Sequence, residues 1–183
     1  MKLMIASDIH GSAYYCKKMV AAYQREHADR LLLLGDILYH GPRNDLPEDY
    51  DPSCHLSFKS SEAGNSLRTR KLRHGSRSDG PGLSHHAEYC LLELNGQTIF
   101  ATHGHHFNPQ NPPMLKDGDI LLNGHTHIPA NQNMGTYTYM NPGSVSIPKE
   151  GSAHGYMIFD GAFTWKDLDG NVLDISSNAS AAR

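Results

Sequence analysis

Carboxylate and imidazole side chains follow several short apolar runs of this 183-residue sequence, at spacings that suit a metal ion. In an extended strand residues i and i+2 project to the same side, so Asp8 with His10, and His125 with His127, each form a pair at a strand end. Either pair alone could be an ordinary surface pair. Mixed Asp and His donors favour Mn²⁺, Fe²⁺ or Zn²⁺, whereas Ca²⁺ prefers oxygen alone. Such donor residues follow four different apolar runs, and this repetition predicts a divalent-metal site. Its candidate ligands are Asp8, His10, Asp36, His103, His125 and His127.

The elements that must position the first of these residues form a strand–helix–strand unit. Lys2–Ala6 and Leu31–Leu34 are apolar without polar alternation, which is typical of parallel strands covered on both faces. Ser12 can cap a helix between them. One face of that helix is apolar, at the positions Cys16, Met19, Val20 and Tyr23. Both strands therefore deliver a carboxylate at their C-terminal ends.

The second half of the chain consists of strands separated by polar loops. Tyr89–Leu94 and Thr98–Thr102 flank the turn residues Asn95 and Gly96, which predicts a hairpin. Two further strands are predicted at Ile120–Leu122 and Thr136–Met140, and an antiparallel meander at Tyr156–Ile175. The fold class is therefore α/β, a two-sheet sandwich with helices outside and the strand-end loops at one edge.

Composition excludes several classes of function. The net charge of −3 provides no general basic field, so a nucleic-acid partner is not expected. No run approaches the ~18 apolar residues of a membrane helix, and the N-terminal run lacks the ~7–15 apolar residues of a secretion signal. Three widely spaced cysteines argue against a disulfide framework. We expect a cytoplasmic protein that does not contact a membrane.

The order and wording of the motifs resemble the metallophosphoesterase (calcineurin-like) superfamily, and within it the YfcE-type phosphodiesterases of bacteria. The resemblance covers the chain before residue 52 and after residue 87. Five segments carry it: Ala6–Gly11, Gly35–Asn44, Thr102–His105, Gly124–Pro129 and Asn141–Pro148.

The resemblance implies a four-layer sandwich flanked by helices, with a pair of divalent ions, commonly manganese, at one edge. It assigns the ligands as follows: Asp8, His10 and His127 to one ion, His103 and His125 to the other, and Asp36 to both as the bridge. It also implies hydrolysis of small phosphodiesters by a hydroxide between the ions, because two cations ~3.5–4 Å apart lower the pKa of a shared water.

His40 and Arg43 lie in the loop after the bridging carboxylate and are predicted to bind substrate. A guanidinium can hold a phosphoryl oxygen in two-point contact. Arg43 could instead pair with Asp45 or Asp49 at the surface. The turn Asn141–Ser144 is interpreted as structural support for the metal edge, without a chemical role.

One motif of the family is missing between Asp36 and His103: Gly-Asn followed by His or Cys and an acidic residue. Segment 53–86 stands there, without any Val, Ile, Met, Tyr or Trp. Its four Arg and two Lys against Glu62 and Asp79 give a net charge of +4, although the whole chain carries −3. The family's asparagine is a ligand of the second ion, so we expect this chain to hold the first ion better than the second.

Two interpretations of segment 53–86 stay open within a single domain of residues 1–183. It could be a disordered or nucleic-acid-binding basic insertion, or it could be translated out of frame. Codons for Thr69–His86 can be chosen so that reading one base later gives Arg-Gly-Asn-Cys-Asp, which restores the motif. We favour a compensated pair of frame changes, around residue 52 and near His86–Ala87.

Two other functions stay open at this point. The same fold serves as a non-catalytic scaffold in a retromer subunit, and the missing motif would suit such a role. A phosphomonoesterase is the other alternative, because the sequence does not set how many phosphate substituents the site admits. No Ser, Cys or Thr nucleophile motif competes with the metal chemistry.

Overall fold

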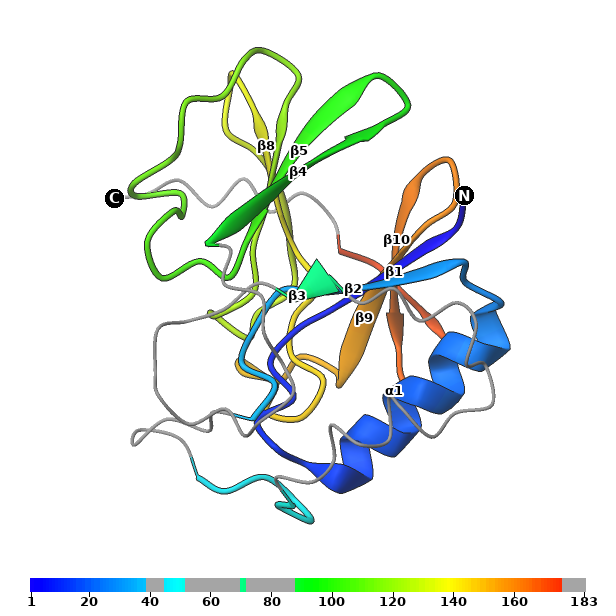
Figure 1. Cartoon of the computed structure of the whole chain (residues 1–183). Helices are drawn as coiled ribbons and strands as arrows, with labels where there is room; N and C mark the ends of the chain where they lie inside the picture. The colour runs from blue at the N-terminus through cyan, green and yellow to red at the C-terminus, as the bar shows by residue number, and fades with distance from the viewer. Residues whose placement is uncertain (39–44, 52–69, 72–87, 176–183) are drawn as a thin grey trace.

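The structure of the chain is a computed structural model that describes residues 1–38, 45–51, 70–71 and 88–175. Within these residues one helix, α1 (Ala13–Glu26), accompanies two sheets (Figure 1). The first sheet has six strands in the order β11 (Val172–Leu173), β10 (Phe163–Asp167), β9 (Gly155–Phe159), β1 (Leu3–Ala6), β2 (Arg30–Leu33) and β3 (Arg70–Lys71). The second has five in the order β4 (Tyr89–Leu94), β5 (Gln97–Thr102), β6 (Ile120–Leu122), β8 (Thr138–Asn141) and β7 (Ala130–Asn133).

The first sheet is built on a parallel pair, β1 and β2, joined by α1. Leu3 pairs with Arg30, and β9 pairs with β1 in antiparallel orientation on its other side. Ser12 caps α1, because its hydroxyl accepts a hydrogen bond from the backbone N–H of Tyr15 at 3.2 Å. These features confirm the predicted strand–helix–strand unit. They also bring the C-terminal ends of β1 and β2 to the same edge.

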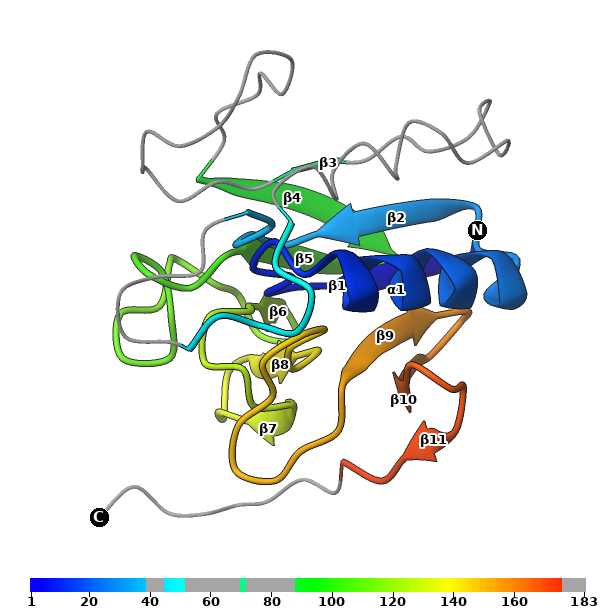
Figure 2. The same ribbon diagram turned by 90° about the horizontal axis from the view of Figure 1, so that it is seen from below.

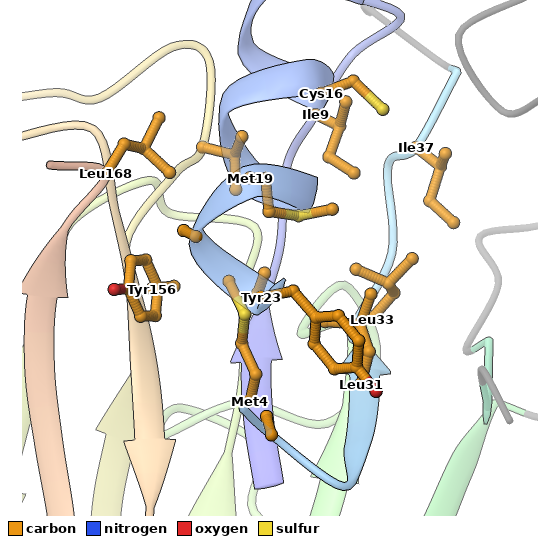
Figure 3. Packing of buried hydrophobic residues seen from close by; sticks show 14 of the residues in the cluster. Met4, Ile9, Cys16, Met19, Tyr23, Leu31, Leu33, Ile37, Tyr156 and Leu168 are labelled. Carbon is orange, nitrogen blue, oxygen red and sulfur yellow. The ribbon is translucent and has the colours of Figure 1, made fainter. Parts of the chain in front are cut away.

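Both faces of β1 and β2 are buried, as their uninterrupted apolar runs predict. On one face, Met4 packs with Met19 and Tyr23 of α1 and with Tyr156 of β9 (Figure 3). The other face belongs to a core between the sheets, formed by Leu3, Ile5, Leu32 and Leu34 from the first sheet and Ile99, Ile120, Leu122 and Met140 from the second. The two sheets therefore form the predicted sandwich.

The second sheet has three parallel strands, β5, β6 and β8, with β4 and β7 antiparallel at its edges (Figure 2). Asn95 and Gly96 join β4 to β5 with positive φ angles of 52° and 77°, which confirms the predicted hairpin. On its outer face Phe100 and Tyr139 pack beside Phe107 of the loop after β5.

The C-terminal part confirms the predicted meander, because β9, β10 and β11 pair in antiparallel order. Segment 53–86 lies outside the described residues, apart from Arg70–Lys71, which pair with β2 as β3. In the described part of the chain, α1 is too short and too polar to cross a membrane.

Candidate metal centre

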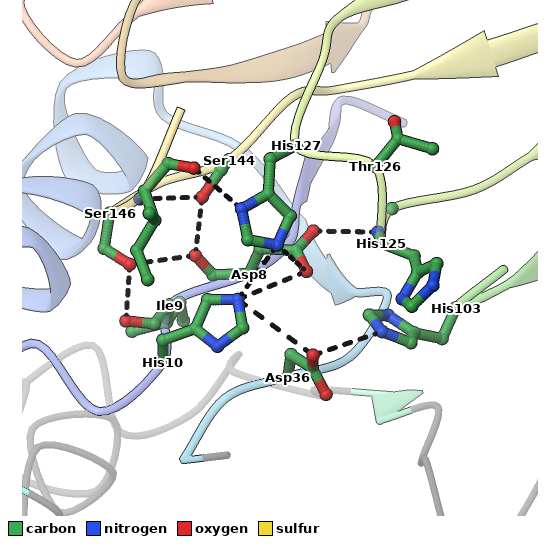
Figure 4. Close-up of polar contacts among 12 residues, drawn as sticks. Asp8, Ile9, His10, Asp36, His103, His125, Thr126, His127, Ser144 and Ser146 are labelled. Carbon is green, nitrogen blue, oxygen red and sulfur yellow. Dashed lines mark hydrogen bonds and ion pairs between the residues drawn. The ribbon is translucent and has the colours of Figure 1, made fainter. Parts of the chain in front are cut away.

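The six side chains predicted to bind metal gather at one edge of the sandwich (Figure 4). They stand on loops that follow β1, β2, β5 and β6, so both sheets contribute. They form two groups, in each of which the candidate ligand atoms lie within 4.8 Å of one another: Asp8, His10 and His127 in the first, and Asp36, His103 and His125 in the second. Each group combines residues of the first sheet with residues of the second.

Most of these residues adopt left-handed backbone conformations. The φ angles are 59° at Asp8, 52° at His10, 43° at Asp36, 69° at His125 and 65° at His127. The pairs Asp8/His10 and His125/His127 are therefore not extended, as the spacing argument assumed, but turn sharply within each loop. Such a conformation costs a non-glycine residue about 1–3 kcal/mol and persists only where its surroundings hold it. Here the N–H of Asp8 donates to Gly35 O at 3.2 Å, and that of His10 donates to Asp36 O at 2.8 Å.

The first group is buried and close-packed. Asp8, His10 and His127 expose 0%, 1% and 2% of their surfaces. Asp8 Oδ1 lies 3.5 Å from His10 Nε2 and 3.4 Å from His127 Nε2, and the two Nε2 atoms lie 3.1 Å apart. Three donor atoms from three side chains thus face one small space.

The protonation of His127 shows that this group fits a cation. His127 Nδ1 lies 2.7 Å from the carbonyl oxygen of Ile147. A carbonyl only accepts hydrogen bonds, so Nδ1 carries a proton, and in the tautomer with that single ring proton Nε2 presents a lone pair toward Asp8 and His10. Asp8 Oδ1 is buried and makes no well-aligned hydrogen bond with the described residues. Asp8 Oδ1 and His127 Nε2 thus offer an oxygen and a nitrogen donor side by side, a combination that suits a divalent transition metal.

The second group lies beside the first and opens to solvent. Asp36 Oδ2 lies 3.4 Å from His103 Nε2 and 4.0 Å from His10 Nε2, so this carboxylate stands between the two groups. The rings of His103 and His125 have centroids 5.1 Å apart. His103 is buried, whereas His125 is exposed. A substrate can therefore approach the centre from the side of His125.

The electrostatics favour an ionised Asp8 carboxylate between the rings. Burial raises the pKa of Asp8, but the contacts with His10 and His127 outweigh it and hold the pKa well below its usual value. Burial lowers the pKa of His103, and the neighbouring Asp36 outweighs that effect and raises it. For His125, burial and the nearby His103 lower the pKa. At neutral pH, Asp8 is therefore a charged donor within a buried site.

Two glycines let the loops approach closely. A Cβ atom on Gly124 would lie 2.8 Å from Asp8 Oδ2 and 2.8 Å from Ser7 Cβ. A Cβ atom on Gly35 would lie 2.5 Å from His103 Nδ1. Both positions therefore need glycine for the ligands to meet.

Comparison with known proteins assigns this arrangement to a family. The calcineurin-like phosphoesterase superfamily domain matches residues 1–162. The chain belongs to this superfamily. It is 40% identical over 166 residues to phosphodiesterase YfcE of Escherichia coli K12. The matched region covers 87% of this chain and 88% of that protein. The predicted resemblance is thereby confirmed.

Solved structures agree with this superfamily assignment. The structure of YfcE, a phosphoesterase from E. coli, superposes with a TM-score of 0.83 at 36% identity and covers 94% of this chain and 97% of its own. Vps29 of Entamoeba histolytica, solved with Zn²⁺, superposes with a TM-score of 0.56 at 18% identity over 94% of this chain and 96% of its own, which shows a shared fold alone.

Some site residues cannot be placed, and others were not predicted. His40 and Arg43, predicted to bind substrate from their place in the loop after Asp36, lie outside the described residues. Ser144 was interpreted only as part of a supporting turn and Ser146 was given no role, although both hydroxyls lie within 3.0 Å of the carbonyl oxygen of Asp8. The signal for them was the Asn-Pro-Gly-Ser turn at a strand end, next to the motifs that carry the ligands.

Proposed function

We propose that this chain is a cytoplasmic phosphodiesterase that uses two divalent cations, Mn²⁺ in both positions, to hydrolyse small phosphodiesters. Its membership of the phosphoesterase superfamily and its 40% identity to a phosphodiesterase support the reaction class. The observation that carries the proposal is the pair of three-residue donor groups that share one edge of the sandwich. The three widely spaced cysteines of the sequence suit a reducing compartment, which cell fractionation would test.

The first cation would be held by Asp8, His10 and His127, and the second by His103 and His125, with Asp36 between them. When bound, such a pair of cations supplies Lewis-acid activation of the phosphate and of the attacking water. We expect the first group to bind more tightly than the second, because the amide ligand that the family supplies to the second ion is missing from the sequence.

The residues of the chain prepare the site for this chemistry. Asp8 is fully buried and excludes water from the first group, which strengthens each electrostatic contact there. Ile147 O keeps the proton of His127 on Nδ1, so that Nε2 stays available as a donor. Exposed His125 leaves the second group open to a phosphoryl group.

Hydrolysis of bis-p-nitrophenyl phosphate with and without Mn²⁺ tests the proposal. We expect Mn²⁺-dependent release of p-nitrophenol, and a loss of at least tenfold in Asp8→Asn, because the amide lacks the negative charge with which the carboxylate binds the cation. Asp160→Asn is the matched control, since Asp160 is an exposed carboxylate in the β9–β10 turn. We expect it to keep the wild-type rate.

The outcomes separate the proposal from its two alternatives. A background rate in both conditions, together with measurable Mn²⁺ binding, would establish the non-catalytic scaffold instead. Faster turnover of p-nitrophenyl phosphate than of the diester would establish a phosphomonoesterase. Mn²⁺-dependent turnover that is unchanged in Asp8→Asn would contradict the assignment of the first group.

A further inference from the structure

A short segment after β8 contacts both loops that carry the first metal group. This segment, Asn141–Ile147, is called the support segment below. Asn141 and Ser144 expose 0% of their surfaces, and Ser146 exposes 5%. Buried polar side chains are nearly always hydrogen-bonded, so the partners of these three residues indicate which parts of the protein the segment holds in place.

The amide of Asn141 holds the loop of His125. Its Nδ2 donates to Gly124 O at 2.8 Å and lies 3.1 Å from Thr126 Oγ1, so it binds the residues on either side of His125. Its Oδ1 accepts from the N–H of Gly143 at 2.8 Å, and its own carbonyl accepts from Trp165 Nε1 at 2.7 Å. Asn141 is thereby fixed between the core and the ligand loop.

The two serines hold the loop of Asp8. Ser144 Oγ donates to Asp8 O at 2.9 Å. Ser146 Oγ lies 3.0 Å from Asp8 O and 2.8 Å from Ile9 O, and its single proton serves one of these two carbonyls at a time. These bonds grip the backbone where φ of Asp8 is 59°, the conformation that needs external support.

The same segment also orients the third donor of the group. Ser144 Oγ accepts from the N–H of Ile147 at 2.9 Å, and Ile147 O accepts from His127 Nδ1 at 2.7 Å. A continuous chain of hydrogen bonds thus runs from the backbone of Asp8 through Ser144 and Ile147 to the ring of His127.

We propose that Ser144 and Ser146 are positioning residues that align Asp8 and His127 as donors for the first cation. The metal part of this inference rests on the proposed function, whereas the alignment itself belongs to the protein without metal. Removal of either hydroxyl leaves a buried carbonyl with one donor fewer and releases the strained backbone of Asp8. Removal of the Ser144 hydroxyl also deprives the Ile147 N–H of its acceptor, so Ile147 O is held less firmly opposite His127 Nδ1.

Two measurements on Ser144→Ala and Ser146→Ala test the proposal. Calorimetric titration with Mn²⁺ is expected to show an affinity about tenfold weaker than that of the wild type in each variant, the lower end of the loss typical for residues that orient metal ligands. Nitrogen-15 NMR of the histidine rings in the metal-free protein is expected to show His127 with its proton on Nδ1 in the wild type. In Ser144→Ala, a measurable share of the rings should carry it on Nε2.

Tyr156→Phe is the matched control, because it also removes a buried hydroxyl. Tyr156 exposes 0% of its surface, and its hydroxyl donates to Glu26 Oε1 at 2.9 Å. Neither residue belongs to the metal centre. We expect this variant to lose stability but to keep the Mn²⁺ affinity and the His127 proton of the wild type.

Each outcome bears on one of the two proposals. Serine variants with wild-type affinity and the wild-type His127 tautomer would overturn the positioning role and leave the phosphodiesterase proposal standing. An equal loss of affinity in Tyr156→Phe would also overturn it, since general loosening would then explain the effect. If the wild type bound no Mn²⁺, the proposed function would fail, and the tautomer in Ser144→Ala would alone decide whether the alignment exists.

Discussion

Replacing Gly124 with Ala is expected to push the first metal group apart. The new Cβ atom would lie 2.8 Å from Ser7 Cβ and would also overlap Ser7 Oγ. Non-bonded carbon atoms in contact lie about 3.5–4.0 Å apart. The loops of Gly124 and Ser7 must therefore separate by at least roughly 0.7 Å to bring the new Cβ atom and Ser7 Cβ to such a distance. Ser7 and Asp8 are both fully buried.

The size of this shift decides its effect. Metal–ligand distances tolerate about 0.2 Å, so a displacement of about 0.7 Å next to Asp8 exceeds the tolerance several times. We expect Mn²⁺ affinity at the first group to fall by at least tenfold, and overpacking to cost about 1–3 kcal/mol of stability.

Calorimetric titration with Mn²⁺ and urea unfolding of the metal-free protein measure the two effects. Gly96→Ala is the matched control: Gly96 has a φ of 77° with open space around it in the β4–β5 turn, so an alanine there costs stability through backbone strain alone. We expect it to keep full Mn²⁺ affinity. If Gly124→Ala bound Mn²⁺ as tightly as the wild type, close packing of Gly124 on Asp8 would not be what holds that carboxylate.

Three further predictions follow from other parts of the molecule. Addition of Mn²⁺ at 100 times its dissociation constant should raise the free energy of unfolding by about 2.7 kcal/mol, and a chelator should reverse this in urea melts; identical melts would contradict the metal site. Burial raises the pKa of Glu26, but hydrogen bonds from Lys166 and Tyr156 outweigh it and hold the pKa below its ordinary value of 4.5. Glu26→Gln should therefore lower the free energy of unfolding by about 2 kcal/mol at pH 7. This difference between wild type and variant should shrink as the pH falls through 4.5 and disappear below the pKa of Glu26 in the folded protein. A difference that stayed constant with pH would show that the charge of Glu26 does not contribute to stability. Resequencing the coding DNA around segment 53–86 should reveal two compensating frame changes, and the protein encoded by the restored frame should bind the second Mn²⁺ more tightly than this chain; DNA that encodes segment 53–86 as it stands would rule out a sequencing error as the source of the frame changes.

The parts of the fold that carry a strong periodic pattern were predictable. Lys2–Ala6 and Leu31–Leu34 were uninterrupted apolar runs, and both became strands buried on two faces. The turn at Asn95–Gly96 fixed its hairpin through residues that accept positive φ angles. Because parallel strands end at a common edge, the strand assignments predicted that the donors of each sheet lie together, whereas the meeting of the two sets depends on how the sheets pack.

Other features depend on tertiary contacts that no local pattern reports. Strand β7 (Ala130–Asn133) was not predicted, because Ala and Asn have low strand propensity and this strand forms only by pairing with β8. The left-handed conformation of Asp8 and His10 was also missed, since it is imposed by distant hydrogen bonds. The sequence indicated that the turn Asn141–Ser144 supports the metal edge, but the contact of Ser144 with Asp8 was not predicted, because the two residues lie 136 positions apart in the sequence.

The candidate metal centre lies where the two sheets of the sandwich meet. Each donor group takes members from both sheets, so Asp8 and His127 meet only when the two sheets keep their mutual alignment. A slip of one sheet over the other would uncouple the donors without touching any of them. Substitutions in the core between the sheets, such as at Ile5 or Ile120, are therefore expected to alter turnover although they do not contact the site. A bound cation would in return stabilise the packing of one sheet on the other.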